Sequence, residues 1–355
     1  MALPSVLLHD HLDGGLRPRT VIELAEASGY EGLPAGNDLD LACWFDQKGS
    51  GSLETYLQAF DHTIAVMQSV EALQRVAYEA ASDLSADGVV YAEIRFSPPL
   101  HTERGLNQSQ VIEAVASGMR MGEQETGIRW GLIIDALRHL PDSEQLASLA
   151  LQHRHLGVVG FDIAGPEAGF PPEDHLAAFR LARSGGLRLT IHAGESGGLR
   201  GVAHIASAMD RCGAERIGHG LEIVNDCEIE DGEITKLGRV ARRVRDRRLP
   251  LEICPASSLA TNRLQPDEHP VGLLYRAGFN VTLSTDNRLM SSTSMSGEFD
   301  FVRKYHGFGI DDLARITRRS LEAAFCPWEH KAELWEDLIA PAYAAAGAAP
   351  DPAWA

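Results

Sequence analysis

Cysteine is scarce in this sequence of 355 residues, and no two cysteines are closely spaced. The five cysteines are odd in number and form no C-x-x-C pair. This excludes a disulfide framework and a zinc site built from cysteines, and it predicts a protein of the reducing cytoplasm. Long apolar runs are absent too. No stretch approaches the ~20 apolar residues of a membrane span, and the N-terminus lacks the basic segment of a secretion signal.

Basic residues are outnumbered by acidic ones. The chain has 32 Lys and Arg against 50 Asp and Glu, which gives a formal net charge of −18. Such a charge repels phosphate backbones and anionic lipids, so we expect neither nucleic acid nor a membrane as a partner. Hydrophobic residues make up 44% and charged residues 23% of the chain, which is ordinary globular usage and excludes disordered, collagenous and coiled-coil classes. Nothing in the sequence indicates an oligomeric state.

Short β-branched runs alternate with helical patterns along almost the whole chain. Apolar runs such as GVVYAEI and LRLTIHA are typical of parallel strands that are buried on both faces. We expect eight strands, at Val6–His11, Val89–Phe96, Trp130–Ala136, Val158–Ile163, Leu187–His192, Arg216–His219, Leu249–Cys254 and Val281–Thr285. Helical patterns lie between them, for example at Leu53–Ala86, Gln108–Thr126, Glu173–Ser184, Gly232–Arg247 and His269–Gly278.

This alternation predicts an α/β fold, a closed (β/α)8 TIM barrel, as one domain over residues 1–355. A doubly wound open sheet is the alternative, but no G-x-G-x-x-G follows the first strand. The surplus over the roughly 250 residues of a barrel lies mainly at about 14–87, directly after the first strand. Because this insertion is rich in aromatic residues and follows the first strand on the catalytic face, it predicts a helical lid, with extra helical packing as the alternative. Residues 344–355 are expected to form a frayed tail.

Ionisable residues gather at the carboxyl ends of four predicted strands, which is where barrel enzymes build their active sites. Two histidines that are two positions apart on a strand share one face, so the pair on the first strand points one way. These residues are His9 and His11 on the first strand, His192 and Glu195 at the fifth, His219 at the sixth, and Asp286 with Asn287 at the eighth.

Each of these motifs alone is weak. An H-x-H pair is more often two hydrogen-bonded or surface histidines than a metal site, and Thr-Asp-Asn is common in turns. Together they form a set of three histidines and one carboxylate that suits a single Zn²⁺ per chain, namely His9, His11, His192 and Asp286. An open coordination position would hold a water whose pKa falls toward ~7, with His219 and Glu195 left as acid and base groups.

At these residues the sequence resembles the adenosine deaminase family of the amidohydrolase superfamily. The matching segments are, in order, LLHDHLDGGLRP, VVYAEIRFSP, FDIAG, IHAGE, RIGHG, LEICPASS and LSTDN, and they extend from residue 7 to about 300. FDIAG has no lysine at the end of the fourth strand, where a carboxylated lysine bridges the metals of binuclear members of the superfamily. The resemblance therefore implies one metal.

The resemblance also implies roles for individual residues. Zinc would be held by His9, His11, His192 and Asp286. Glu195 would protonate the purine nitrogen next to the attacked carbon, and His219, helped by Asp286, would orient the attacking hydroxide. Gly165 would offer its backbone N–H to another ring nitrogen, and Asp13 would meet the ribose. Asn287 stands where many members have a second aspartate, and its amide can donate to the purine N7.

Two loops depart from the family pattern, at Ser196–Gly198 and at Leu259–Asn262, which leaves the distal group of the substrate open. The expected reaction is hydrolytic deamination of adenosine and 2′-deoxyadenosine to inosine and 2′-deoxyinosine with release of ammonia. A deaminase of a 5′-modified adenosine, such as 6-aminodeoxyfutalosine, is one alternative, and a catalytically silent metal-binding barrel is another. The cytidine and tRNA deaminases are excluded, because their P-C-x-x-C signature is absent.

Overall fold

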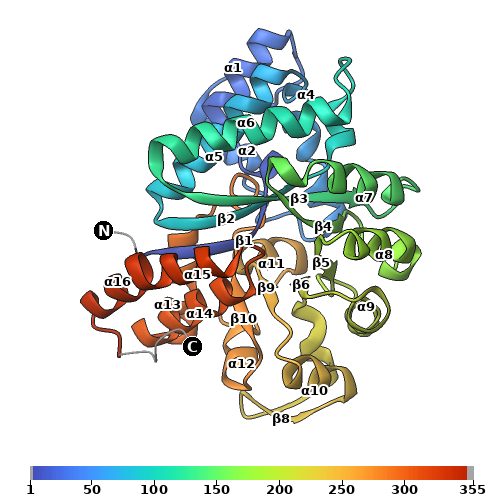
Figure 1. Ribbon diagram of the computed structural model, residues 1–355. Coiled ribbons are helices and arrows are strands. Elements are labelled where there is room, and N and C mark those ends of the chain that lie inside the picture. Colours follow the sequence, from blue (N-terminus) through green and yellow to red (C-terminus); the bar gives the residue numbers. More distant parts are fainter. Residues whose placement is uncertain (1–2, 350–355) are drawn as a thin grey trace.

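Eight parallel strands form the centre of the molecule in the computed structural model, which describes residues 3–349 (Figure 1). The strand order is β1-β2-β3-β4-β5-β6-β9-β10. The bounds are β1 Ser5–His11, β2 Val89–Phe96, β3 Arg129–Leu137, β4 Val158–Ala164, β5 Arg188–Ala193, β6 Arg216–His219, β9 Leu251–Ile253 and β10 Val281–Leu283. An isolated parallel bridge between Asp10 and Asp286 brings the first and last strands together. The predicted (β/α)8 barrel is confirmed.

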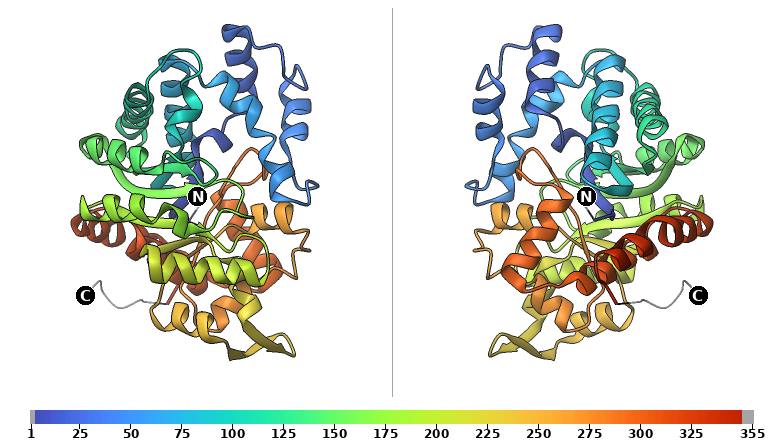
Figure 2. Two further views of the ribbon diagram at one scale, coloured as in Figure 1. Left: turned by 90° about the vertical axis from the view of Figure 1, so that its right-hand side faces the viewer. Right: turned by 90° about the vertical axis from the view of Figure 1, so that its left-hand side faces the viewer.

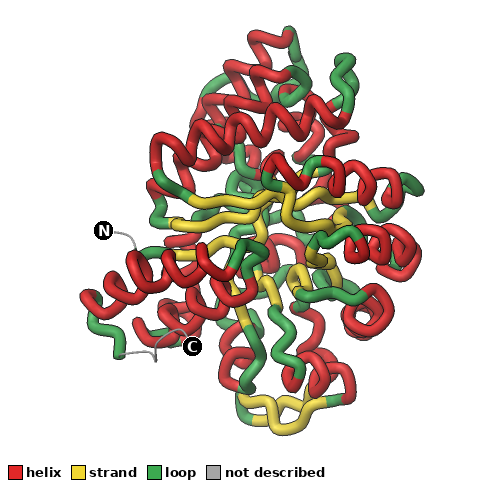
Figure 3. The backbone as a smooth tube through the Cα atoms, in the orientation of Figure 1, coloured by secondary structure: helices red, strands yellow, loops and turns green. Residues whose placement is uncertain are grey.

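Helices surround these strands on the outside (Figure 3). Their bounds are α1 Pro18–Ser28, α2 Asp38–Phe45, α3 Leu53–Leu57, α4 Phe60–Val66, α5 Val70–Ala86, α6 Gln108–Thr126, α7 Ser143–Gln152, α8 Leu176–Ser184, α9 Leu199–Ser207, α10 Arg239–Asp246, α11 Pro255–Asn262, α12 Val271–Arg276, α13 Met295–His306, α14 Ile310–Ala323, α15 Trp328–Glu333 and α16 Ala340–Ala345. Within residues 3–349, no helix has both the length and the apolar character needed to cross a membrane.

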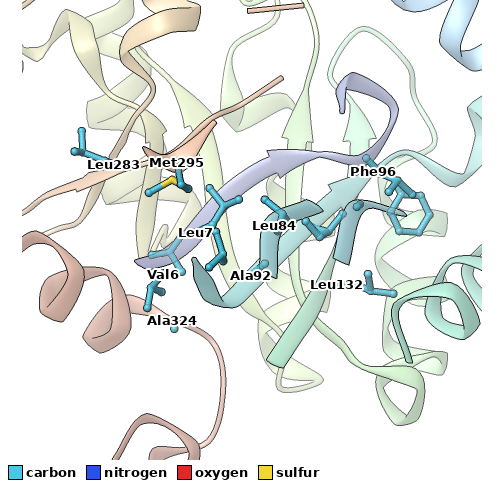
Figure 4. Close-up of a cluster of buried hydrophobic side chains, with 14 of the residues drawn as sticks. Val6, Leu7, Leu84, Ala92, Phe96, Leu132, Leu283, Met295 and Ala324 are labelled. Atoms are coloured by element: carbon cyan, nitrogen blue, oxygen red, sulfur yellow. The ribbon is translucent and has the colours of Figure 1, made fainter. Parts of the chain in front are cut away.

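Apolar side chains pack between the strands and the helices. Figure 4 shows part of this layer, where Leu84 of α5 lies near Ala92 of β2. The inside of the barrel is different, because alternate residues of a strand point inward. Glu93 and Arg95 of β2 are fully buried, and so is Glu252 of β9. The barrel therefore has an apolar outer layer and a charged interior below its carboxyl end.

The helical stretch expected over 53–86 is divided into three helices, α3, α4 and α5. Serine side chains start two of them: Ser52 accepts a hydrogen bond from the Thr55 N–H, and Ser69 accepts one from the Ala72 N–H. These helices and α1 and α2 make up the predicted insertion, and Figure 2 shows them gathered at one end of the molecule.

The helical stretch expected over 232–247 is wrong in its first part. A hairpin of β7 (Cys227–Glu230) and β8 (Glu233–Leu237) precedes α10. Its two-residue loop, Asp231-Gly232, has φ of 50° and 75°, the left-handed conformation that an Asp-Gly hairpin turn requires. At the other end of the chain, α16 includes the first two residues of the predicted tail 344–355, and residues 350–355 lie outside the described residues.

Candidate active site

Four ligand atoms converge at the carboxyl ends of β1, β5 and β10. His9 and His11 lie on β1, His192 on β5, and Asp286 follows β10, and their potential ligand atoms all lie within 4.8 Å of one another. Asp286 Oδ1 is 3.3 Å from His9 Nε2 and 3.4 Å from His11 Nε2. The structure thus brings together all four residues that the sequence suggested as metal ligands.

The donor set fits a metal ion. His9 Nε2 is buried and has no hydrogen-bond partner among the described residues. His11 Nε2 and His192 Nε2 face each other at 3.3 Å. Three imidazole nitrogens and a carboxylate oxygen that point at one space are the ligands that Zn²⁺ commonly takes. This cluster can therefore hold a metal ion.

A second group of titratable side chains lies beside these ligands. The His219 Nε2 and Glu195 Oε2 atoms are 3.8 Å apart, and both side chains are buried. Burial, followed by the charges of Asp286 and Glu167, raises the pKa of Glu195 well above its usual range. Burial lowers the pKa of His219 well below its usual range. Burial therefore favours the protonated form of Glu195, which can donate a proton, and the neutral form of the His219 imidazole.

Two of these residues have unusual backbone angles. His219 and Asp286 both have φ of 60°, which is rare for residues with a side chain. Non-glycine residues in this conformation occur preferentially at functional sites, where the surrounding structure maintains the strain. Here the turn at the end of β6 and of β10 brings each side chain into the common space.

A cavity of about 280 Å³ opens over this cluster. Five carboxyl side chains line it, and none of its lining residues within 3–349 is Lys or Arg. Its other side is formed by apolar side chains of α3 and α4, namely Leu53, Tyr56, Leu57, Phe60 and Ile64. Helices of the predicted insertion thus form one side of the cavity.

The remaining predicted residues line the same cavity. Gly165 follows β4, Asp13 follows β1, and Asn287 follows Asp286. Burial raises the pKa of Asp13 to about 7. A Cβ on Gly14 would lie 2.0 Å from Asn287 Oδ1, so only glycine allows this close approach. The Asn287 side chain therefore packs against the Gly14 backbone at the edge of the cavity.

Carboxylates that were not identified from the sequence hydrogen-bond to the ligand histidines and to the backbone around Glu195. Glu252 and Asp162 contact His9 and His192. Glu167 accepts hydrogen bonds from the backbone N–H groups of Gly194, Glu195 and Ser196, at 2.7, 3.0 and 3.1 Å. One signal was available, since Glu93, Arg95, Asp162 and Glu252 are isolated charges within otherwise apolar strands.

Comparison with known proteins gives one consistent result. The family model of adenosine deaminase matches residues 4–341. The adenosine deaminase of Mycobacterium ulcerans is 49% identical over 349 residues, covering 96% of this chain and 95% of that protein. The crystal structure of an adenine deaminase from Arthrobacter aurescens superimposes with a TM-score of 0.85 at 26% identity, covering 98% of this chain and all of that one. The crystal structure of an Arabidopsis N6-mAMP deaminase superimposes with a TM-score of 0.79 at 26% identity, covering 94% of this chain and 97% of that one.

Proposed function

The chain belongs to the adenosine deaminase family, and on that premise we propose that it hydrolyses adenosine and 2′-deoxyadenosine to inosine and 2′-deoxyinosine, releasing ammonia. One observation carries this proposal: the buried carboxyl of Glu195 and the buried imidazole of His219 lie beside a cluster of four potential metal ligands, and one cavity opens over them. A silent metal-binding barrel would need neither Glu195 nor His219 beside its ligands.

We assign one zinc ion to His9, His11, His192 and Asp286. The chemistry expected of zinc at this set is the activation of a water for attack at neutral pH. His219, which lies beside these ligands, would orient the attacking water and take part in moving its proton. Asp286 would assist His219 in this role. Its Oδ1 faces the metal position, and its Oδ2 accepts a hydrogen bond from the Ser257 hydroxyl at 2.6 Å, which fixes the carboxylate.

Glu195 supplies the proton that the purine ring needs. Attack at C6 places negative charge on the ring, and a proton from Glu195 to the adjacent nitrogen absorbs it. The raised pKa of Glu195 favours the protonated form that this step needs. Departure of ammonia then needs a second proton, which the Glu195–His219 pair can return to the leaving nitrogen.

The other lining residues orient the substrate. The Gly165 N–H donates to a second ring nitrogen, the Asn287 amide donates to N7, and Asp13 accepts from the ribose. The cavity has five carboxyl groups and no lining Lys or Arg among the described residues, so it lacks the cations that usually pair with a 5′-phosphate. This supports nucleosides as the substrates, in contrast to the N6-mAMP deaminase that shares the fold.

Ammonia release by the purified protein tests the proposal. The panel consists of adenosine, 2′-deoxyadenosine, adenine, methylthioadenosine and 6-aminodeoxyfutalosine. Adenosine and deoxyadenosine should give the highest kcat/KM. A preference for either of the last two compounds would indicate a 5′-modified substrate, and absence of ammonia with all five would contradict deamination.

We also propose that the protein is located in the cytoplasm, because its five cysteines are free.

A further inference from the structure

We propose that three buried carboxylates, Glu252, Asp162 and Asp135, are positioning residues that set the orientation and tautomer of the three ligand histidines. Each carboxylate faces the Nδ1 atom of a different histidine. The Nε2 atoms are thereby left as the three nitrogens that face the metal position. This inference rests on the metal site of the proposed function.

Two of the three contacts are buried hydrogen bonds. His9 Nδ1 is 3.0 Å from Glu252 Oε2, and His192 Nδ1 is 2.7 Å from Asp162 Oδ2. A carboxylate can only accept, so each imidazole carries a proton on Nδ1, and in its neutral form, the form that binds a metal, it presents an unprotonated Nε2. Asp162 also accepts the backbone N–H of His192 at 3.0 Å, which fixes the residue as well as its ring.

The third contact is looser. His11 Nδ1 is 3.4 Å from Asp135 Oδ2, and the other Asp135 oxygen has no hydrogen-bond partner among the described residues. Asp135 lies on β3, is 1% exposed and lines the cavity. Its effect on the histidine can be tested without disturbing other contacts, because its removal breaks no other hydrogen bond of residues 3–349.

Arg95 joins the two tighter carboxylates. Its Nη1 donates to Asp162 Oδ2 at 2.6 Å, and its Nη2 donates to Glu252 Oε2 at 3.0 Å. The guanidinium is fully buried, and Nη2 also donates to the Leu8 carbonyl. One rigid fork on β2 thus sets the spacing between the partners of His9 and His192, which come from strands at different places around the barrel.

Outer partners of this kind fix the ring and raise the basicity of a metal-bound histidine, and their loss typically weakens metal affinity by about 10–100-fold. We expect a loss in that range for Asp162→Asn and Glu252→Gln. For Asp135→Ala the longer contact predicts a loss at the lower end of that range, about tenfold, and Asp135→Asn, which keeps an acceptor, should lose less than Asp135→Ala.

The experiment measures the dissociation constant of Zn²⁺ by competition with a chromophoric chelator, and the visible spectrum of the Co²⁺-substituted protein. Glu93→Gln is the matched control. Glu93 is buried in the same barrel interior and contacts no histidine; it pairs with Arg216, which also pairs with Glu252, so this variant tests a carboxylate one residue further from the ligands. This control should lower thermal stability and leave both metal readouts as in the wild type.

The outcomes separate this inference from the proposed function. If the wild type binds no zinc, the proposed metal site fails. If the wild type binds zinc and the Asp162, Glu252 and Asp135 variants bind it within twofold of the wild type, the positioning role alone is wrong. An equal loss of affinity in Glu93→Gln would also overturn it, because the effect would then come from the barrel interior as a whole. Should Asp162→Asn and Glu252→Gln not fold, the two Asp135 variants still decide.

Discussion

The two walls of the cavity are built in different ways. The polar wall consists of His11, His192, Glu195, His219 and Asp286, which lie at strand ends, and the apolar wall consists of Leu53, Leu57, Phe60 and Ile64 on α3 and α4. Strand pairing sets the polar wall, since Ala193 pairs with His219 and Asp10 with Asp286. The apolar wall stands on helices of five and seven residues.

Helices this short are not stable by themselves, so packing must hold the apolar wall in place. One polar link to the opposite side is a 2.7 Å hydrogen bond between Tyr56 Oη and Ser291 Oγ. The comparison suggests a division of work. The polar wall touches the reacting atoms and should govern kcat, whereas the apolar wall holds the substrate equally in its ground and transition states and should govern KM.

The largest effect should follow loss of a ligand on the polar wall. His192→Ala removes one of the three nitrogens at the metal position, so activity should fall below detection. Elemental analysis should find about one zinc per chain in the wild type and a small fraction of that in the variant. A fully active, zinc-free preparation would remove the basis for the polar wall as described.

Glu195→Gln should come next, with kcat about 10²–10⁴-fold lower, because the amide cannot donate the acidic proton. Zinc content should be unchanged, since Glu195 is outside the four-donor set. Steady-state kinetics together with elemental analysis check both statements. A variant within threefold of the wild type would show that Glu195 has a structural role only.

A negative charge on the substrate should lower kcat/KM by at least about 100-fold, as a comparison of AMP with adenosine would show. A 5′-phosphate about 4 Å from an ionised carboxylate costs about 4 kcal/mol at an effective dielectric of 20, which exceeds that factor. We therefore expect adenosine to exceed AMP in kcat/KM at pH 8, above the raised pKa of about 7 of Asp13. Asp13→Asn should narrow the gap. Equal use of AMP and adenosine by the wild type would contradict the placement of the ribose at Asp13.

Glu167→Gln tests whether the polar wall depends on the hydrogen bonds that Glu167 accepts from the backbone of residues 194–196. Burial alone would raise the pKa of Glu167, but its hydrogen bond with His204 and the charge of Arg138 lower it, so the group is ionised. Without that charge the 194–196 loop loses its anchor, and displacement by about 1 Å can cost up to about 100-fold in rate. We expect kcat to fall by about 10–100-fold with KM nearly constant.

Glu173→Gln is the control for this prediction, because Glu173 binds Ser207 and Arg211 instead of the loop. A Glu167 variant whose KM rises while kcat stays constant would refute the anchoring role.

The smallest effect is expected on the apolar wall. Phe60→Ala removes apolar contact worth about 1.5–3 kcal/mol for a fully buried side chain, and less here because Phe60 is half-buried. KM should rise about tenfold or less, and kcat should stay within a factor of about two. Leu39→Ala, in the same insertion but 73% exposed and outside the cavity, should change neither. A large loss of kcat in Phe60→Ala would contradict the assignment of kcat to the polar wall and of KM to the apolar wall.

The difference between the walls also explains what the sequence could predict. Strand ends of a parallel barrel meet at one rim, so motifs such as His9-x-His11 and Ser284-Thr285-Asp286 could be assigned to one site once eight strands were recognised. Local signals at Ser52 and Ser69 were present but were outweighed by the long helical pattern over 53–86. The Asp231-Gly232 turn was likewise hidden between acidic residues that also suit a helix.

The supporting carboxylates needed information that a sequence does not carry. That Glu252 meets His9, 243 residues away, depends on the register of β9 and on the inward face of two strands. Single charges within apolar strands indicate that a partner exists, because an unpaired buried charge is costly, but they do not say which one. Only the packed barrel pairs Arg95 with both Asp162 and Glu252.

The bridge between Asp10 and Asp286 has a consequence for how the ring of strands forms. It consists of two backbone hydrogen bonds, from His11 N to Asp286 O and from Asp286 N to His9 O, at 2.7 and 2.9 Å. The residues that it joins are about 280 positions apart, a separation whose closure costs about 5 kcal/mol of chain entropy. The same three residues supply metal ligands, so ion binding would stabilise the joint at which the barrel closes. Amide hydrogen exchange at His11 and Asp286 should therefore slow on zinc addition more than exchange at the β3–β4 pairing on the other side of the barrel.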